Sequence, residues 1–403
     1  MENKKQIWII NHYAFPYGYG FHTRQHTIAK MLKNLGCEVT IFTSSFNHLK
    51  LKDVEIENIY QEEIFDSIKY IWIKTQKYQG NGFGRIKNIF EFSKNLNKIY
   101  KNFDNKPDIV WVSSPHPFSI YNGIKIKNYF KSKFIFEERD IWPLTLQILN
   151  GISKYNPLSI IFRYLQIQAY KHSDMIVTPL DNLKEFIEKS GFKNKKIEYL
   201  PQPFVKFDIE KFPIGLPKEK FIVGYVGSIG HSNSVMNLLK AANLLKENRD
   251  IFFAIVGDGP QLDELKNFTK QNNIKNIKFF GKLKKNKAMY IISECSILYK
   301  GNPNIELYKY GIGSVKLIEY LWFNKPIINA TNIKNDLVFL SNAGLTIRCD
   351  DEYELKDSIL KLKENKEFYD EHCENGRKFV ENNFMEEVIK IKLKYIMDSL
   401  GFI

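Results

Sequence analysis

Two apolar segments in the second half of the chain each end in a glycine turn that precedes a helical pattern. Phe221–Gly230 ends in Gly-Ser-Ile-Gly, and Ile251–Pro260 ends in Gly-Asp-Gly-Pro. Further short apolar runs at 277–281 and 296–299 continue this alternation. Because alternating strands and helices favour a parallel sheet, we predict an α/β fold whose ligands lie beyond the carboxyl ends of the strands.

The two glycine turns fall at those carboxyl ends, where glycine allows a ligand to approach the backbone closely. Each turn alone is a weak signal, but their order and spacing together predict a binding site. The candidate binding residues of the turns are Gly227, Ser228, Gly230, Gly257, Asp258 and Gly259.

The segment Gly311–Tyr320 is expected to be a glycine-rich loop followed by a helix, with Ser314 as its N-cap. The start of a helix offers unpaired N–H groups and positive dipole charge to a phosphate. Lys316 would add a full positive charge there. Glu319, on the same face, can accept two hydrogen bonds from a ribose diol. The alternative is an ordinary amphipathic helix with an exposed Lys–Glu pair.

Taken together, these segments resemble the retaining glycosyltransferases of family four. The resemblance runs through GYVGSIG, IVGDGP, FFGKL and KLIEYLWFNKPII, and it extends over nearly the whole chain. It is greatest to bacterial enzymes of O-antigen and capsule synthesis that add N-acetylated amino sugars. It adds three residues to the expected donor site, Leu283, Gly313 and Leu317.

The resemblance implies the GT-B architecture, in which two Rossmann-like, doubly wound parallel-sheet domains face a cleft. The expected domains are an acceptor-side domain at 1–204 and a nucleotide-sugar-binding domain at 205–380. A final helix at 381–403 is expected to pack back on the first domain.

The first half supplies further candidate residues at strand ends. Gly18 and Gly20 follow the first strand, where the family has a glycine loop beside the donor phosphate or the acceptor. The resemblance implies that His116 hydrogen-bonds the donor sugar or the transition state; a structural role is the alternative. Arg139 and Asp140 lie in a segment similar to the ERDLWP motif of amino-sugar transferases. They are expected either to position the acceptor or to pair with each other.

The chain departs from the family pattern at three places. Gly311 stands where the first of two glutamates is usual, so backbone groups of the 310–313 loop would replace it. The turn Ser228–Ser232 lacks the Arg and Lys that commonly clamp the diphosphate, which leaves Lys316 and helix N-termini. Gln202 and Pro203 replace part of the usual interdomain linker. These departures concern donor identity and hinge behaviour more than fold.

A net charge of +14 indicates a polyanionic partner or surface. No helix-turn-helix, RNA-binding or zinc signature is present, so we expect no nucleic acid. Residues 69–101 are basic and aromatic, and part of this stretch has a helical apolar stripe that includes Ile86, Ile89, Phe90 and Leu96. An anionic membrane surface is one partner for such a helix; a solvated helix on its own domain is the alternative. The residues assigned to the membrane surface are Arg85, Lys87, Lys94 and Lys98.

No segment has the roughly 18 consecutive apolar residues of a membrane span, and no signal-peptide pattern opens the chain. The four cysteines show no ligand spacing. No Asp-x-Asp pair lies in a suitable loop, so we expect no metal and no cofactor. The expected location is the cytoplasm, peripheral to the inner face of the plasma membrane.

The predicted reaction moves a sugar, expected to be an N-acetylated amino sugar on UDP, from a nucleotide diphosphate with retention at the anomeric carbon. The acceptor is expected to be a saccharide or a polyprenyl-diphosphate-linked glycan. Two alternatives stay open: a sugar-nucleotide epimerase of the same architecture, and an inactive nucleotide-sugar-binding subunit, which Gly311 favours. Interconversion of the nucleotide sugar without acceptor would identify the first, and transfer of label would exclude the second.

Overall fold

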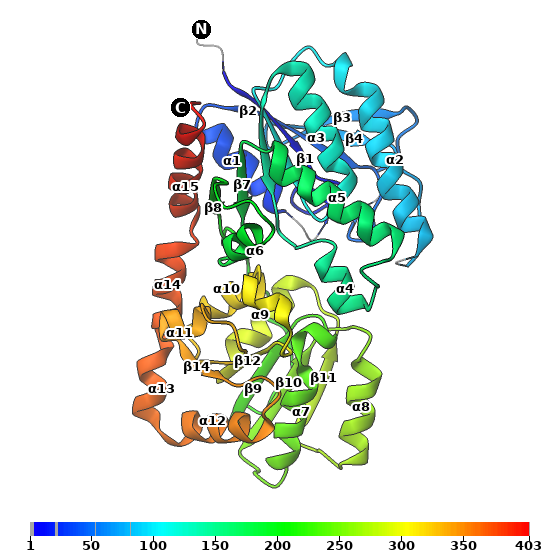
Figure 1. Ribbon diagram of the computed structural model, residues 1–403. Coiled ribbons are helices and arrows are strands. Elements are labelled where there is room, and N and C mark those ends of the chain that lie inside the picture. Colours follow the sequence, from blue (N-terminus) through cyan, green and yellow to red (C-terminus); the bar gives the residue numbers. More distant parts are fainter. Residues whose placement is uncertain (1–3, 21–22, 53, 81, 403) are drawn as a thin grey trace. The chain divides into compact units, whose positions relative to one another are not determined.

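The computed structural model describes residues 4–20, 23–52, 54–80 and 82–402. The chain divides into two compact units (Figure 1). The first runs up to Pro203 and takes up the chain again from Glu386, and the second is Phe204–Met385. The expected domain limits, after 204 and after 380, lie close to these divisions. We describe each unit by itself.

The first unit is built on an eight-stranded sheet with the order β3-β4-β2-β1-β5-β6-β7-β8 among the described residues. Its strands pair in parallel, except that β3 runs antiparallel to β4 at one edge. The inner strands are apolar and almost completely buried, as in a sheet covered on both faces. The strands are β1 Gln6–Ile10, β2 Glu38–Ser44, β3 Tyr60–Phe65, β4 Ile68–Ile73, β5 Ile109–Ser113, β6 Lys133–Glu137, β7 Met175–Thr178 and β8 Ile197–Tyr199.

Helices from both ends of the chain cover the first sheet. The red α15 packs beside the blue α1 in Figure 1, and Ile389 and Leu393 of α15 join the same core as Ile7 and Trp111. The helices of this unit are α1 Arg24–Asn34, α2 Phe83–Ile99, η1 Tyr100–Asn102, α3 Pro117–Phe130, α4 Leu144–Asn150, α5 Pro157–His172, α6 Leu183–Lys189 and α15 Glu386–Ser399.

The second unit has a six-stranded sheet in which every described strand pairs in parallel, in the order β11-β10-β9-β12-β13-β14. This order places β9 and β12 next to each other at the centre. The strands are β9 Phe221–Val226, β10 Ile251–Val256, β11 Ile277–Gly281, β12 Ile297–Gly301, β13 Ile327–Ala330 and β14 Gly344–Ile347.

Two apolar clusters lie on opposite faces of the second sheet, because successive strand side chains alternate between faces. Leu298 packs with α9 and α10, while its neighbour Tyr299 packs with α7 and α12. The helices are η2 His231–Asn233, α7 Val235–Leu244, α8 Leu262–Gln271, α9 Lys285–Glu294, η3 Glu306–Tyr310, α10 Val315–Leu321, α11 Leu337–Ser341, α12 Glu352–Glu364, α13 Lys366–Cys373 and α14 Asn375–Asn383. The predicted α/β class with two parallel-sheet domains is confirmed.

The basic stretch 69–101 begins as strand β4 and becomes helical only from Phe83. Of the predicted apolar stripe, Ile89 and Leu96 are buried whereas Phe90 is 55% exposed, so these residues do not share one buried face. The inner face of α2 instead carries the polar Asn88 and Ser93. Nowhere in the described chain is there a helix of the length and apolarity that crossing a membrane requires.

Candidate functional site

The turns that follow β9 and β10 lie against each other at the carboxyl edge of the second sheet. The N–H of Gly227 donates to Val256 O across 2.9 Å, and that of Ile229 donates to Asp258 O across 2.9 Å. A Cβ on Gly257 would stand 1.8 Å from Gly227 O, so this approach requires glycine. The structure therefore brings together the two predicted turns, which contain Gly227, Ser228, Gly230, Gly257, Asp258 and Gly259.

Lys316 extends from the first turn of α10 over the β9 turn. Its Nζ donates to Tyr225 Oη across 3.0 Å and to Asn233 Oδ1 across 2.9 Å. A Cβ on Gly227 would stand 2.2 Å from that Nζ, so the lysine occupies the space that the glycine leaves. Burial lowers the pKa of Lys316 to about 8, although Glu319 opposes the shift. The result is a largely desolvated ammonium held by neutral oxygens.

Glu319 already has a cationic partner. Lys285 Nζ of α9 lies 2.7 Å from Glu319 Oε1, and the glutamate side chain is 17% exposed. A ribose diol that reached this carboxylate would share it with Lys285, because a carboxylate has about four acceptor positions.

Four other residues expected near the donor differ in their surroundings. Ser314 occupies the N-cap position of α10, but its hydroxyl donates to Ile312 O across 3.3 Å and makes no capping bond. Leu317 is buried in the core, and Leu283 packs against the same cluster. The Leu317 side chain thus packs in the core, and a contact between the donor and this position stays a prediction. Gly313 is exposed.

Sequence reasoning missed Lys300, the next-to-last residue of strand β12. The side chain is 5% exposed, and its Nζ donates to Gly301 O across 2.8 Å and to Asn302 Oδ1 across 2.7 Å. Burial, followed by the charge of Lys316, lowers the pKa of Lys300 to about 7. One signal was available, because a lysine inside an otherwise apolar strand rarely becomes buried without a functional reason.

In the first unit, Gly18 and Gly20 lie in a compact turn after β1. The N–H of Tyr19 donates to Pro16 O across 3.1 Å, and Gly20 pairs with Lys50 in an isolated antiparallel bridge. The turn is thus tied to the segment that follows β2.

His116 is the N-cap of α3. Its Nδ1 accepts from the Ser119 N–H across 3.0 Å, so Nε2 carries the proton and donates to Ile89 O across 3.0 Å. The side chain is 1% exposed and stacks on His12, with ring centroids 5.1 Å apart. Burial lowers the pKa of His116 to about 4, so the ring is neutral at pH 7.

Both ring nitrogens of His116 are therefore engaged within the unit. A direct bond from this ring to a sugar requires one of them to change partner. The contact with the donor sugar stays a prediction, and the observed role is to begin α3 and hold it to α2.

Arg139 and Asp140 follow β6 and are held through their backbones. Both N–H groups donate to Ser114 Oγ, across 2.8 Å and 3.3 Å. Within the described ranges no ion pair joins the two side chains, so the alternative in which they support the loop by pairing with each other is not observed. Asp140 is exposed and Arg139 is partly buried.

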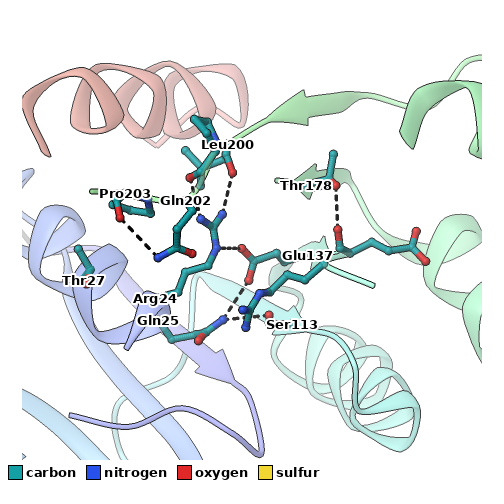
Figure 2. Close-up of polar contacts among 12 residues, drawn as sticks. Arg24, Gln25, Thr27, Ser113, Glu137, Thr178, Leu200, Gln202 and Pro203 are labelled. Carbon is teal, nitrogen blue, oxygen red and sulfur yellow. Dashed lines mark hydrogen bonds and ion pairs between the residues drawn. The ribbon is translucent and has the colours of Figure 1, made fainter. Parts of the chain in front are cut away.

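Arg24 of α1 connects three parts of the first unit (Figure 2). Its Nε donates to Glu137 Oε1 across 2.7 Å, while Nη1 and Nη2 donate to Pro201 O and Leu200 O across 2.7 Å and 2.8 Å. Gln25 Nε2 adds a bond to Glu137 Oε2 across 3.2 Å. Burial alone would raise the pKa of Glu137, but the guanidinium of Arg24, the charge of Arg139 and the hydrogen bonds to the carboxylate together hold it below its usual value.

The next residue, Glu138, makes its contacts on the opposite face of the sheet. Tyr170 and Gln166 of α5 donate to its carboxylate, and Thr178 Oγ1 donates to its carbonyl across 2.8 Å. Burial raises the pKa of Glu138 to about 7. These two glutamates fix the end of β6, and with it the position of Arg139.

Three of the four residues assigned to a membrane surface face outward. Lys87, Lys94 and Lys98 are exposed on α2. Arg85 is different, because its Nε and Nη2 donate to Tyr13 Oη across 3.2 Å and 3.1 Å. These bonds hold the partly buried Arg85 side chain to Tyr13, and its role at a membrane surface stays a prediction.

Across the described stretches, no three His, Cys, Asp or Glu side chains gather in a group suited to a metal ion.

Comparison with known proteins gives two family matches that together span most of the chain. The model of Glycosyltransferase Family 4 matches residues 20–204, and that of Glycosyl transferases group 1 matches residues 206–379. An uncharacterized glycosyltransferase of Methanocaldococcus jannaschii is 27% identical over 226 residues, which are 53% of this chain and 56% of that protein. The match thus spans little more than half of that relative.

Two solved structures are similar over nearly their full lengths. Sucrose-phosphate synthase from Thermosynechococcus elongatus has a TM-score of 0.76 at 15% identity, covering 99% of each chain. HepE of Anabaena, solved in complex with UDP and glucose, has a TM-score of 0.66 at 12% identity, covering 98% of this chain and 100% of that one. At these identities the similarity establishes the fold.

Proposed function

We propose that this chain, which consists of a Glycosyltransferase Family 4 domain and a Glycosyl transferases group 1 domain, transfers a sugar from a nucleoside diphosphate to an acceptor hydroxyl. One observation carries the proposal: Lys316 is held by Tyr225 and Asn233 over Gly227, at the carboxyl ends of a parallel sheet. Ligands of such sheets bind at that edge, and a desolvated ammonium there suits a diphosphate.

The donor is proposed to be a UDP-linked, N-acetylated amino sugar. Glu319 supplies a carboxylate for the ribose diol, and the glycine turns after β9 and β10 allow the phosphates to approach the backbone. UDP is supported by the UDP found with HepE, and the amino sugar by the sequence resemblance to amino-sugar transferases.

The chemistry is proposed to proceed with retention and without a metal. The leaving nucleoside diphosphate gains negative charge as the glycosidic bond breaks, and Lys316 stabilises it in a site with little water. Retention would show as an unchanged anomeric configuration in the NMR spectrum of the first product. Metal independence would show as full turnover in EDTA.

The acceptor is proposed to be a saccharide or a glycan on polyprenyl diphosphate, used in surface polysaccharide synthesis at the inner face of the plasma membrane. The outer side of α2 supports this, because exposed lysines there lie beside an apolar groove between α2, α3 and α5. The groove is lined by Phe90, Lys94, Phe118, Tyr121, Ile160 and Tyr164. Basic and aromatic side chains together suit an anionic lipid surface.

Calorimetric titration of the full chain with UDP, GDP and TDP tests the donor assignment. We expect UDP to bind tightest and Lys316→Met to weaken it by about tenfold or more, since a charged hydrogen bond is worth about 1.5–3 kcal/mol. Lys240→Met, an exposed lysine on α7, is the matched control and should bind as the wild type does. If none of the three nucleotides binds, the proposal is overturned.

A further inference from the structure

Lys300 and Lys316 approach the turn after β9 from two different elements. Lys316 binds Asn233 Oδ1 directly, whereas Lys300 binds Asn302 Oδ1, and Asn302 Nδ2 donates to Ser232 O across 3.2 Å. Lys316 thus holds Asn233 directly, and Lys300 holds the adjacent Ser232 through Asn302. The turn itself, Ser228–Ser234, contains no lysine or arginine.

Neither lysine has a carboxylate partner among the described residues. The acceptors of Lys300 are Gly301 O and Asn302 Oδ1, and those of Lys316 are a tyrosine hydroxyl and an asparagine oxygen. An ammonium has three donors, so each lysine keeps one N–H beyond these two bonds. Two neighbouring cations, one buried and one partly buried, that have no described carboxylate within ion-pair distance are costly, and a bound anion would lower that cost.

We propose that Lys300 is the second cation of the diphosphate site and acts with Lys316 on the two phosphates of the donor. This inference rests on the proposed function, because it assigns a residue to the same nucleotide site. It also explains how the site can work without the Arg and Lys that the β9 turn lacks: the positive charge comes from β12 and α10 instead.

This arrangement predicts that diphosphate binding depends on pH. Burial and the charge of Lys316 lower the pKa of Lys300 to about 7, opposed by Asp336 at the start of α11 and by Cys349 after β14. Glu319 of α10 and Tyr225 of β9 are the titratable groups that act on Lys316, and burial raises the pKa of Tyr225 out of the physiological range. A diphosphate favours the protonated lysine, so binding takes up a proton above pH 7. Affinity is full below the free pKa of Lys300 and falls as pH rises through it.

Lys300→Met tests the assignment, with UDP and uridine as probes. We expect UDP affinity at pH 7 to fall by about tenfold or more while uridine affinity is unchanged, because uridine has no phosphate. Lys240→Met should match the wild type with both probes. Wild-type UDP affinity in a folded Lys300→Met protein overturns the inference and leaves the proposed function standing. If the wild type binds neither UDP, GDP nor TDP, both fail.

A second measurement covers the case in which Lys300→Met does not fold. Titration of Lys316→Met with UDP at pH 7.5–9.5, in buffers of different ionisation enthalpy, should show net proton uptake centred at a higher pH than in the wild type, because Lys300 remains but the charge of Lys316 no longer lowers its pKa. This range lies above the titration of the terminal phosphate, whose pKa is about 6. Absence of proton uptake in Lys316→Met overturns the inference.

Discussion

Arg24 and Glu137 form a buried ion pair in which the guanidinium Nε lies 2.7 Å from Glu137 Oε1, with side chains 1% and 0% exposed. The same guanidinium donates to the carbonyls of Leu200 and Pro201. One side chain therefore ties α1 to β6 and to the segment that leaves the first unit.

Removing one partner of this pair should lower the free energy of unfolding far more than removing both. Glu137→Ala leaves Arg24 charged and buried, and we expect the free energy of unfolding of the first unit to fall by about 3–5 kcal/mol. The double change Arg24→Met with Glu137→Leu should cost less than the two single changes added together. Urea unfolding followed by tryptophan fluorescence checks this. Additive single and double costs would contradict the account.

The pair also predicts how acid affects the first unit. The folded pKa of Glu137 lies below its unfolded value, because the charges of Arg24 and Arg139 and the hydrogen bonds to the carboxylate together outweigh burial. The stability it contributes is therefore present above the unfolded glutamate pKa of about 4.3 and is lost as pH falls through the folded pKa. Glu137→Gln should lose less stability between pH 5 and pH 3 than the wild type. An equal loss in both would show that other carboxylates govern acid unfolding.

Glu319→Ala should raise the Kd for UDP by about tenfold or more while the fold stays intact, because a charged hydrogen bond to ribose is lost. Lys285→Met is the matched control: it removes the ion pair with Glu319 but leaves the carboxylate free for the ribose. Calorimetry that finds equal UDP affinity in Glu319→Ala and the wild type would remove Glu319 from the nucleotide site.

His116→Ala should destabilise the first unit by about 0.5–2 kcal/mol, because the N-cap of α3 is lost. His116→Asn should restore most of this, since asparagine is a strong N-cap residue. Equal melting temperatures of the two variants would contradict the capping role. Turnover is read in parallel at saturating donor. Activity that stays low in a well-folded His116→Asn protein would support the predicted contact with the sugar, and recovered activity would exclude it.

The outer surface of α2 predicts salt-dependent binding to anionic vesicles. Lys87, Lys94 and Lys98 are exposed, and each charge near such a surface is worth about 1 kcal/mol before salt screens it. Changing all three to Glu should release the protein from anionic vesicles in a sedimentation assay. The control changes Lys240, Lys266 and Lys270 of α7 and α8, which alters the net charge equally. Equal release by both triple variants would argue against a specific surface.

Local patterns in the sequence were enough to predict the elements and the β9 and β10 turns. Strand-to-helix alternation and glycine spacing are short-range features, and Gly227 and Gly257 meet because their strands are neighbours. Side-chain partners across the fold were not predictable. Nothing near Glu137 in sequence indicates Arg24, and nothing near His116 indicates the Ile89 carbonyl. The apolar stripe of α2 did not indicate which face is buried, because the polar Asn88 and Ser93 lie on the inner face while Phe90 is exposed.

Transfer of label from a nucleotide sugar tests the central claim most directly. The full chain is incubated with labelled UDP-, GDP- and TDP-sugars and an extract of lipid-linked glycans, and both the released nucleotide and the labelled lipid are measured. We predict equal amounts of UDP and of labelled glycan from a UDP-linked amino sugar, and strongly reduced transfer by Lys316→Met. No transfer from any donor, or interconversion of the nucleotide sugar without an acceptor, would contradict the assignment as a glycosyltransferase.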